Sequence, residues 1–292
     1  MPQRTIVITG ASDGIGAAAA RRLAGKGDEL VLVGRSAAKT AAVAGPLGAS
    51  YLLADFTRLD DVRALAERLK KAHPRIDVLV NNAGGIMGER ETTADGFEKT
   101  LQVNHLAPFL LTNLLLDVLT ACGARVINTS SVAARLFGHI ELDDLDNHKK
   151  YSPSKAYGDG KLANILFTKE LHRRYHAQGI STAAFHPGNV ATNFAAGSTS
   201  PMRFIYHTPL KHVALISPDK GAETLVWLVD GTPGSDWISG AYYEKKKAAR
   251  TNPQAGDAAL ARGLWDRSAG MVGPAASPQA DVASERGAGR NR

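Results

Sequence analysis

A chain of 292 residues with a formal net charge of +7 is long enough for one large α/β domain with a substantial core. Its basic residues are dispersed apart from Lys245–Lys247, so we expect no nucleic-acid partner. The single Cys122 excludes an intrachain disulfide. No apolar leader precedes the first predicted strand, and no stretch approaches the roughly 18 apolar residues of a membrane span, so we expect a cytoplasmic protein without such a span.

Short β-branched runs alternate along the chain with longer amphipathic segments. Apolar residues at three-to-four spacing predict helices over segments such as 15–25, 59–72, 161–176 and 220–228. This alternation is typical of βαβ units, so we expect an α/β fold with a doubly wound parallel sheet, the Rossmann architecture, with about seven strands. The predicted strands are Arg4–Thr9, Glu29–Val33, Tyr51–Ala54, Ile76–Val80, Arg125–Thr129, Ile180–Phe185 and Gly240–Tyr243.

The apolar pattern stops near the C-terminus, where glycine, alanine, serine, proline and charged residues dominate. Such a composition cannot bury enough apolar surface to form a packed core. We therefore predict a single domain over residues 1–268 and a disordered tail over residues 269–292.

The first predicted strand ends in a glycine-rich turn that leads directly into a helix. A turn in this context lets backbone N–H groups and the positive end of the helix face a pyrophosphate. A structural turn without a ligand is the alternative. We assign to a dinucleotide-binding loop the residues Gly10, Ser12, Asp13, Gly14, Ile15 and Gly16.

The second predicted strand ends in Arg35, at the position where NAD-binding chains place a carboxylate for the ribose hydroxyls. An arginine instead suits a 2′-phosphate through charge-assisted hydrogen bonds, and Lys39 is placed to assist. We therefore expect NADP(H) in preference to NAD(H). An exposed arginine of no consequence is the alternative, and Asp13 adds a negative charge to the nearby loop.

Two overlapping Tyr-x-x-x-Lys pairs, Tyr151/Lys155 and Tyr157/Lys161, compete for one site. Ser152 is a good N-cap and the proline that follows it is a good first helical residue, so the helix should begin there. Tyr151 then lies outside the helix, whereas Tyr157 and Lys161 share one helical face at i and i+4. We select the second pair.

Taken in order, these landmarks resemble the short-chain dehydrogenase/reductase family, most closely its retinol dehydrogenase-like and protochlorophyllide reductase-like branch. The resemblance spans about residues 4–268, although the Tyr157 pair lacks the serine that commonly precedes the lysine. The matching positions are Gly10–Gly16, Asp55, Asn81–Gly84, Asn104, Ser130–Ser131, Tyr157, Lys161 with Leu-Ala-Asn after it, and His186–Gly188 through Thr192.

The resemblance implies hydride transfer between an alcohol and a ketone or aldehyde. Tyr157 would be the acid/base, provided that its ordinary pKa of about 10 is lowered by a positive charge such as that of Lys161. Lys161 would also bind the nicotinamide ribose, and Ser131 would polarise the substrate oxygen. Asn104 would hold a water in a proton relay, since Pro108 lacks the N–H that would bond its carbonyl. A strand-end hydroxyl and a simple helix kink are the alternatives for Ser131 and Asn104.

The same resemblance distributes further residues along the cofactor. Asp55 would contact the adenine, with an ordinary turn aspartate as the alternative. The adenosine ribose would lie along Asn82, Ala83 and Gly84, and the nicotinamide under Pro187 and Gly188 with Val190 and Thr192 at its carboxamide. A tight turn and a plain loop are the alternatives for these two segments.

The remaining predictions concern the substrate, a possible metal site, the oligomeric state and the alternative functions. Apolar and aromatic residues at about 193–218 indicate a small apolar carbonyl or alcohol substrate. His172 and His176 lie at i and i+4 without a third ligand, so we predict no metal. Both a homo-oligomer and a monomer are compatible with the family. A catalytically silent NADP(H)-binding sensor on the same fold and a nucleotide-sugar epimerase or dehydratase are the alternative functions.

Overall fold

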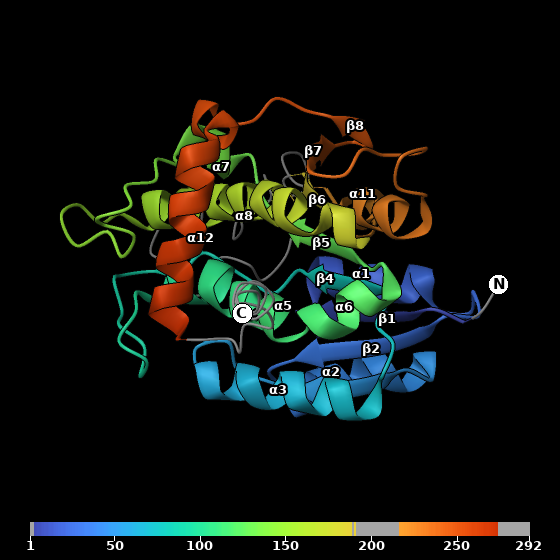
Figure 1. Ribbon diagram of the computed structural model, residues 1–292. Coiled ribbons are helices and arrows are strands. Elements are labelled where there is room, and N and C mark those ends of the chain that lie inside the picture. Colours follow the sequence, from blue (N-terminus) through green and yellow to red (C-terminus); the bar gives the residue numbers. More distant parts are fainter. Residues whose placement is uncertain (1–2, 189, 191–215, 274–292) are drawn as a thin grey trace, which may run out of the picture.

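The computed structural model describes residues 3–188, 190 and 216–273. They form one eight-stranded sheet in the order β3-β2-β1-β4-β5-β6-β7-β8 (Figure 1). All neighbouring pairs are parallel except β7 and β8, which confirms the doubly wound parallel sheet. The strands are β1 Thr5–Thr9, β2 Glu29–Gly34, β3 Ser50–Leu53, β4 Val78–Asn81, β5 Arg125–Thr129, β6 Ser181–His186, β7 Ala241–Glu244 and β8 Lys247–Ala248.

The eighth strand was not predicted. It has only two residues and returns antiparallel to β7 through a tight turn in which Lys245 and Lys246 adopt positive φ angles of 51° and 62°. So short a run carries no alternation of apolar and polar residues, which is why the pattern of the sequence does not reveal it.

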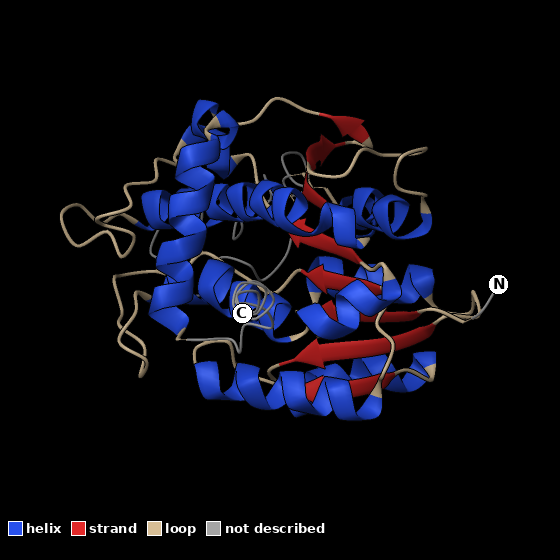
Figure 2. Cartoon of the chain, viewed as in Figure 1, coloured by secondary structure: helices blue, strands red, loops and turns tan. Residues whose placement is uncertain are grey.

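Helices cover both faces of the sheet (Figure 2). Alternating strand residues divide the core into two layers, because successive side chains point to opposite faces: Ile6 and Ile8 pack on one side and Val7 on the other. On the Ile6 side lie α1 Gly14–Leu23, α2 Ala37–Ala44 and α11 Pro218–Asp230. On the Val7 side lie α3 Leu59–Ala72, α5 Ala107–Leu114, α8 Pro153–Tyr175 and α12 Ala258–Val272.

Shorter elements connect this frame. A π-helical turn over Gln102–Leu106 joins α4 to α5. The remaining helices are α4 Lys99–Leu101, α6 Leu116–Cys122 and α7 Ala133–Leu136, and 3₁₀ turns occupy Gly45–Leu47, His176–Gln178 and Pro253–Gly256.

Helix α12 corrects the predicted start of the tail. It crosses α8 and α5, the ring centroid of Trp265 lies 5.0 Å from that of Phe109, and His105 Nε2 lies 2.8 Å from the Ser268 hydroxyl (Figure 1). The helix continues to Val272, which is buried and whose carbonyl accepts a hydrogen bond from Arg63. The domain boundary predicted at 268 is therefore too early, because small residues at 269–270 hide a last buried turn of helix. Residues 274–292 lie outside the described part.

Within the described ranges, no single helix has the length and apolar character needed to cross a membrane. The helical stretches Lys99–Leu114 and Leu116–Cys122 meet that test only when taken together, and they are bent by 64° relative to each other.

Candidate active site

The glycine-rich turn lies where β1 passes into α1, at the carboxyl edge of the sheet. Gly10 and Gly14 have φ angles of +66° and +55°, a left-handed conformation that favours glycine. A Cβ atom on Gly16 would lie 2.4 Å from the Gly10 carbonyl oxygen, and one on Gly10 would lie 2.8 Å from Ala83 Cα. The turn therefore packs directly against the segment that follows β4, and only glycines allow that approach.

Asn82 ties this turn to two neighbouring strands. Its Nδ2 donates to the carbonyl oxygens of Thr9 (3.0 Å) and Gly10 (3.2 Å), and its Oδ1 accepts from the Thr129 hydroxyl at 3.2 Å. Both ends of the amide are thus engaged inside the protein. Contact with a cofactor along 82–84 would therefore come from the backbone rather than from this side chain.

The predicted adenosine end is built from the ends of β2 and β3. Arg35 and Lys39 are both exposed, and a Cβ atom on Gly34 would lie 3.0 Å from Ser12 Cβ, so the end of β2 lies against the glycine-rich turn. Asp55 Oδ1 accepts from both the backbone N–H (3.0 Å) and the hydroxyl (2.9 Å) of Thr57. Its Oδ1 thus stabilises a local turn at the end of β3.

Helix α8 begins where the capping signals predict. Ser152 Oγ accepts from the Lys155 backbone N–H at 3.2 Å, and Pro153 is the first helical residue. Tyr151 therefore lies outside the helix, and Tyr157 and Lys161 lie inside it, one turn apart. This confirms the predicted start of the helix.

Tyr157 and Lys161 are both buried, with 6% and 1% of their surfaces exposed. Lys161 Nζ lies 5.6 Å from the centre of the Tyr157 ring and donates to the Thr129 carbonyl oxygen at 3.2 Å. Burial lowers the pKa of Lys161 to about 7 because the charged ammonium is removed from water. The amine thus changes charge close to neutral pH, next to a tyrosine ring.

Asn104 lies in the π-helical turn before α5, where the Ala107 N–H donates to the Gln102 carbonyl. Its side chain accepts from the Gly85 N–H (3.1 Å) and donates to the Gly85 carbonyl (2.9 Å). A Cβ atom on Gly84 would lie 2.5 Å from Asn104 Oδ1 and 3.0 Å from Lys161 Nζ. The exposed Gly84 therefore lies directly against the buried side chains of Asn104 and Lys161, although it precedes Lys161 by 77 positions in the chain.

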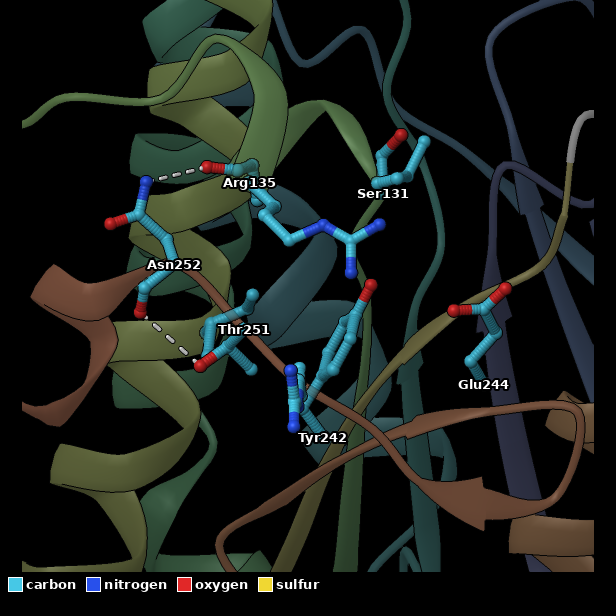
Figure 3. Close-up of a pocket in the computed structure, with 10 residues that line it drawn as sticks. Ser131, Arg135, Tyr242, Glu244, Thr251 and Asn252 are labelled. Atoms are coloured by element: carbon cyan, nitrogen blue, oxygen red, sulfur yellow. Dashed lines mark hydrogen bonds between the residues drawn. The ribbon is translucent and has the colours of Figure 1, made fainter.

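Ser131 follows β5 and opens onto a pocket (Figure 3). Its Oγ accepts from the Ala133 N–H at 3.2 Å, which leaves its own proton available for another acceptor. Asn252 Nδ2 donates to the carbonyls of Ala134 (2.9 Å) and Gly138 (2.7 Å) and so holds the C-terminal segment against α7. The residues around the pocket are Ser131, Val132, Ala134, Arg135, Ile165, Tyr242, Glu244, Arg250, Thr251 and Asn252.

Sequence reasoning identified only Ser131 among these lining residues. Arg135, Tyr242, Glu244 and Arg250 belong to no motif and come from α7, β7 and the segment after β8. The sequence offers one indication that Arg135 lies near this pocket, which is that it follows Ser131 by only four residues.

Beyond β6 the chain turns at Gly188, whose φ is +94°, and a Cβ atom there would lie 2.6 Å from Ile216 Cδ1. Val190 pairs with Ile216 in a parallel bridge. Pro187 and Gly188 thus lie where the chain leaves the sheet edge. Thr192 and the predicted substrate segment up to residue 215 lie outside the described residues.

His172 in α8 and His176 in the 3₁₀ turn that follows it both have partners within the protein. Their ring centroids lie 4.5 Å apart, with His172 Nδ1 2.9 Å from the Ser239 hydroxyl and His176 Nδ1 3.2 Å from the Ile180 carbonyl oxygen. Across the part of the chain that is described, no three histidine, cysteine or acidic residues are grouped so that they could hold a metal ion.

Comparison with known proteins places this chain among the short-chain dehydrogenases and their relatives. The family model of short chain dehydrogenases matches residues 4–202. The chain is 43% identical over 284 residues to DnrU of Streptomyces sp. (strain C5), named as a daunorubicin C-13 ketoreductase, with 94% of this chain and 95% of that protein covered. It is 37% identical over 287 residues to human retinol dehydrogenase 13, with 94% and 86% covered.

Solved structures agree with these relatives. A Mycobacterium paratuberculosis protein superposes with a TM-score of 0.73 at 34% identity, covering 92% of this chain and 93% of that one. The NADP complex of RhlG from Pseudomonas aeruginosa superposes with a TM-score of 0.65 at 26% identity, covering 82% and 93%. The chain therefore belongs to the short-chain dehydrogenase/reductase family, in its retinol dehydrogenase-like branch, and is an oxidoreductase that acts on CH–OH groups with NAD(P)(H).

Proposed function

We propose that this enzyme prefers NADP(H) and interconverts an alcohol with a ketone or aldehyde by using Tyr157, Lys161, Ser131 and Asn104. The observation that carries the proposal is the buried contact between Tyr157 and Lys161 at the carboxyl edge of the sheet. Ligands of doubly wound folds bind at this edge.

The described residues fit a dinucleotide. The left-handed glycines at the start of α1 direct the positive end of a helix toward the sheet edge, which suits a pyrophosphate. We assign the phosphates to Gly10, Ser12, Asp13, Gly14, Ile15 and Gly16, the adenosine to Asp55 and 82–84, and the nicotinamide to Lys161, Pro187, Gly188, Val190 and Thr192. When bound, the nicotinamide supplies the hydride in reduction and accepts it in oxidation.

Arg35 supports the preference for the phosphorylated cofactor. It lies at the end of β2 against the glycine-rich turn, is exposed, and has Lys39 on the next helix for a second positive charge. A guanidinium binds a phosphate through two parallel hydrogen bonds, so a 2′-phosphate gains more from this position than a ribose hydroxyl does.

In the proposed mechanism, Tyr157 donates its phenolic proton to the substrate oxygen during reduction and takes it back during oxidation. The Ser131 hydroxyl donates a hydrogen bond to the same oxygen, for which its proton is available. A protonated Lys161 beside the ring stabilises the negative phenolate. Asn104 holds the proton relay behind Lys161, to which it is linked through Gly84.

The test is oxidation of NADPH and NADH with a panel of aldehydes and ketones, for the wild type, Arg35→Leu and Arg262→Leu. We expect the wild type to prefer NADPH, and Arg35→Leu to raise the KM for NADPH roughly 10- to 100-fold, the value of a charge-assisted hydrogen bond, without changing that for NADH. Arg262, an exposed residue of α12, is the matched control. Cofactor binding without turnover of any carbonyl compound would instead favour the sensor.

A further inference from the structure

The pocket beside Ser131 is polar and charged, although the sequence predicts an apolar substrate. Figure 3 shows the Arg135 side chain extending across it, with the guanidinium lying between Ser131 and the Tyr242 hydroxyl. Glu244 lies on the far side of Tyr242, and Arg250 also lines the pocket. Three separate segments thus bring charged groups to the residue that is proposed to hold the substrate oxygen.

Some of the described arginines are neutralised by a carboxylate, whereas Arg135 and Arg250 are not. Arg4, Arg75 and Arg173 each form an ion pair with a carboxylate. Among the described residues, no ion pair joins Arg135 or Arg250 to Glu244 or to any other carboxylate. The guanidinium of Arg135 therefore enters the pocket with its donors uncommitted.

The residues that line the pocket together favour a negatively charged ligand group that accepts hydrogen bonds. Two arginines and one glutamate leave a net charge of +1 around the pocket. Burial and the nearby Glu244 carboxylate raise the pKa of Tyr242, so its phenol stays protonated and acts as a donor. Ser131 adds a second hydroxyl. Donors and positive charge thus exceed acceptors, which is complementary to a carboxylate.

We propose that Arg135 is a specificity-determining residue that binds a carboxylate of the substrate, so that the preferred substrates are carbonyl compounds that also carry a carboxylate. The planar guanidinium can hold both oxygens of that group at once while the carbonyl lies at Ser131. The inference rests on the proposed function, because it places the reacting carbonyl beside Ser131.

The experiment compares oxo acids of increasing chain length with their methyl esters, which keep the carbonyl and remove the charge. For the wild type we expect kcat/KM to be roughly 10- to 100-fold higher for at least one acid than for its ester. Arg135→Gln should abolish this preference and leave turnover of the ester within about threefold, and Arg135→Lys should retain part of it, because it keeps the charge but loses the paired geometry. Arg262→Leu, outside the pocket, should behave as wild type.

The outcomes separate the two proposals. Equal turnover of acids and esters, or an acid preference that survives in Arg135→Gln, overturns the inference and leaves the oxidoreductase intact. Bound NADPH with no turnover of either series overturns the proposed function, and the inference with it. Thermal unfolding and NADPH binding of Arg135→Gln, both expected to be unchanged for an exposed side chain, exclude misfolding as the cause of a loss.

Discussion

The two Tyr-x-x-x-Lys pairs, six residues apart in the chain, lie in different environments. Tyr151 precedes the cap of α8, and its hydroxyl donates to the Gly88 carbonyl at 3.0 Å. Lys155 Nζ forms an ion pair with Asp159 at 2.6 Å. Tyr157 and Lys161, in contrast, are buried against each other, and Lys161 has no carboxylate partner among the described residues.

The difference shows that the same Tyr-x-x-x-Lys spacing can place the two side chains in very different electrostatic environments. Burial and the Glu98 carboxylate raise the pKa of Tyr151, which opposes loss of its proton. The charge of Lys155 is already neutralised by Asp159, so it cannot favour a phenolate. Lys161 is not neutralised in this way, and its charge acts on the adjacent ring at low local dielectric.

The largest effect is expected from removal of one hydroxyl. Tyr157→Phe should reduce kcat by roughly 10²- to 10⁴-fold, the usual contribution of a general acid, whereas Tyr151→Phe should change it by less than about threefold. Carbonyl-dependent NADPH oxidation measures both variants, and NADPH binding serves as the folding control. Loss of activity in Tyr151→Phe alone would reverse the assignment of the two pairs.

The cluster around Lys161 can be disturbed without changing its charge. Gly84→Ala would bring a methyl group within 2.5 Å of Asn104 Oδ1 and 3.0 Å of Lys161 Nζ, so we expect a loss of stability of about 1–3 kcal/mol from overpacking, together with reduced turnover. Gly270→Ala in α12 meets no atom within 4 Å and should be neutral or slightly stabilising. Urea unfolding and kcat distinguish them, and equal behaviour would contradict the packing described for Lys161.

Lys161 should also leave a signature in the pH dependence of stability. In the folded protein without cofactor its pKa is lowered from 10.5 to about 7, so between these values the unfolded chain binds more protons. Stability therefore rises with pH in that window, by at most about 1.4 kcal/mol per pH unit from this group. Lys161→Met should flatten the slope measured by urea unfolding between pH 7 and 9, and Lys155→Met should not. An unchanged slope in Lys161→Met would mean that the buried amine stays charged.

The smallest effect concerns the start of α8, which separates the two pairs. Ser152→Ala removes the hydroxyl that accepts from the Lys155 N–H and should lower the free energy of unfolding by about 1 kcal/mol. Ser152→Asp, which keeps a capping oxygen, should restore it. Turnover per folded molecule should change little in either variant, and a large fall in kcat for Ser152→Ala would show that the cap also positions Tyr157.

Local patterns in the sequence were sufficient to predict most of the strands and helices of the protein. Strand β5 and helix α3 have the predicted bounds, β1 and β2 differ from prediction by one residue at one end, and β6 is shifted by one residue. Helix α8 begins at the predicted proline because capping and proline geometry act over only a few residues. The parallel sheet and the position of the glycine-rich turn followed from the same alternation.

The sequence therefore determined most of the elements, the glycine-rich turn and the start of α8 between the two tyrosines, since each depends on neighbours within about one helical turn. Tertiary structure alone decided which distant groups meet. Gly84 contacts Asn104 and Lys161 because β4, the π-helical turn and α8 converge at one edge of the sheet. Arg135 shares a pocket with Tyr242 and Glu244 because the fold brings α7 and β7 to one site, although β7 comes more than 100 residues later in the chain. No periodicity or motif records such encounters, because they depend on packing between segments rather than on spacing within them.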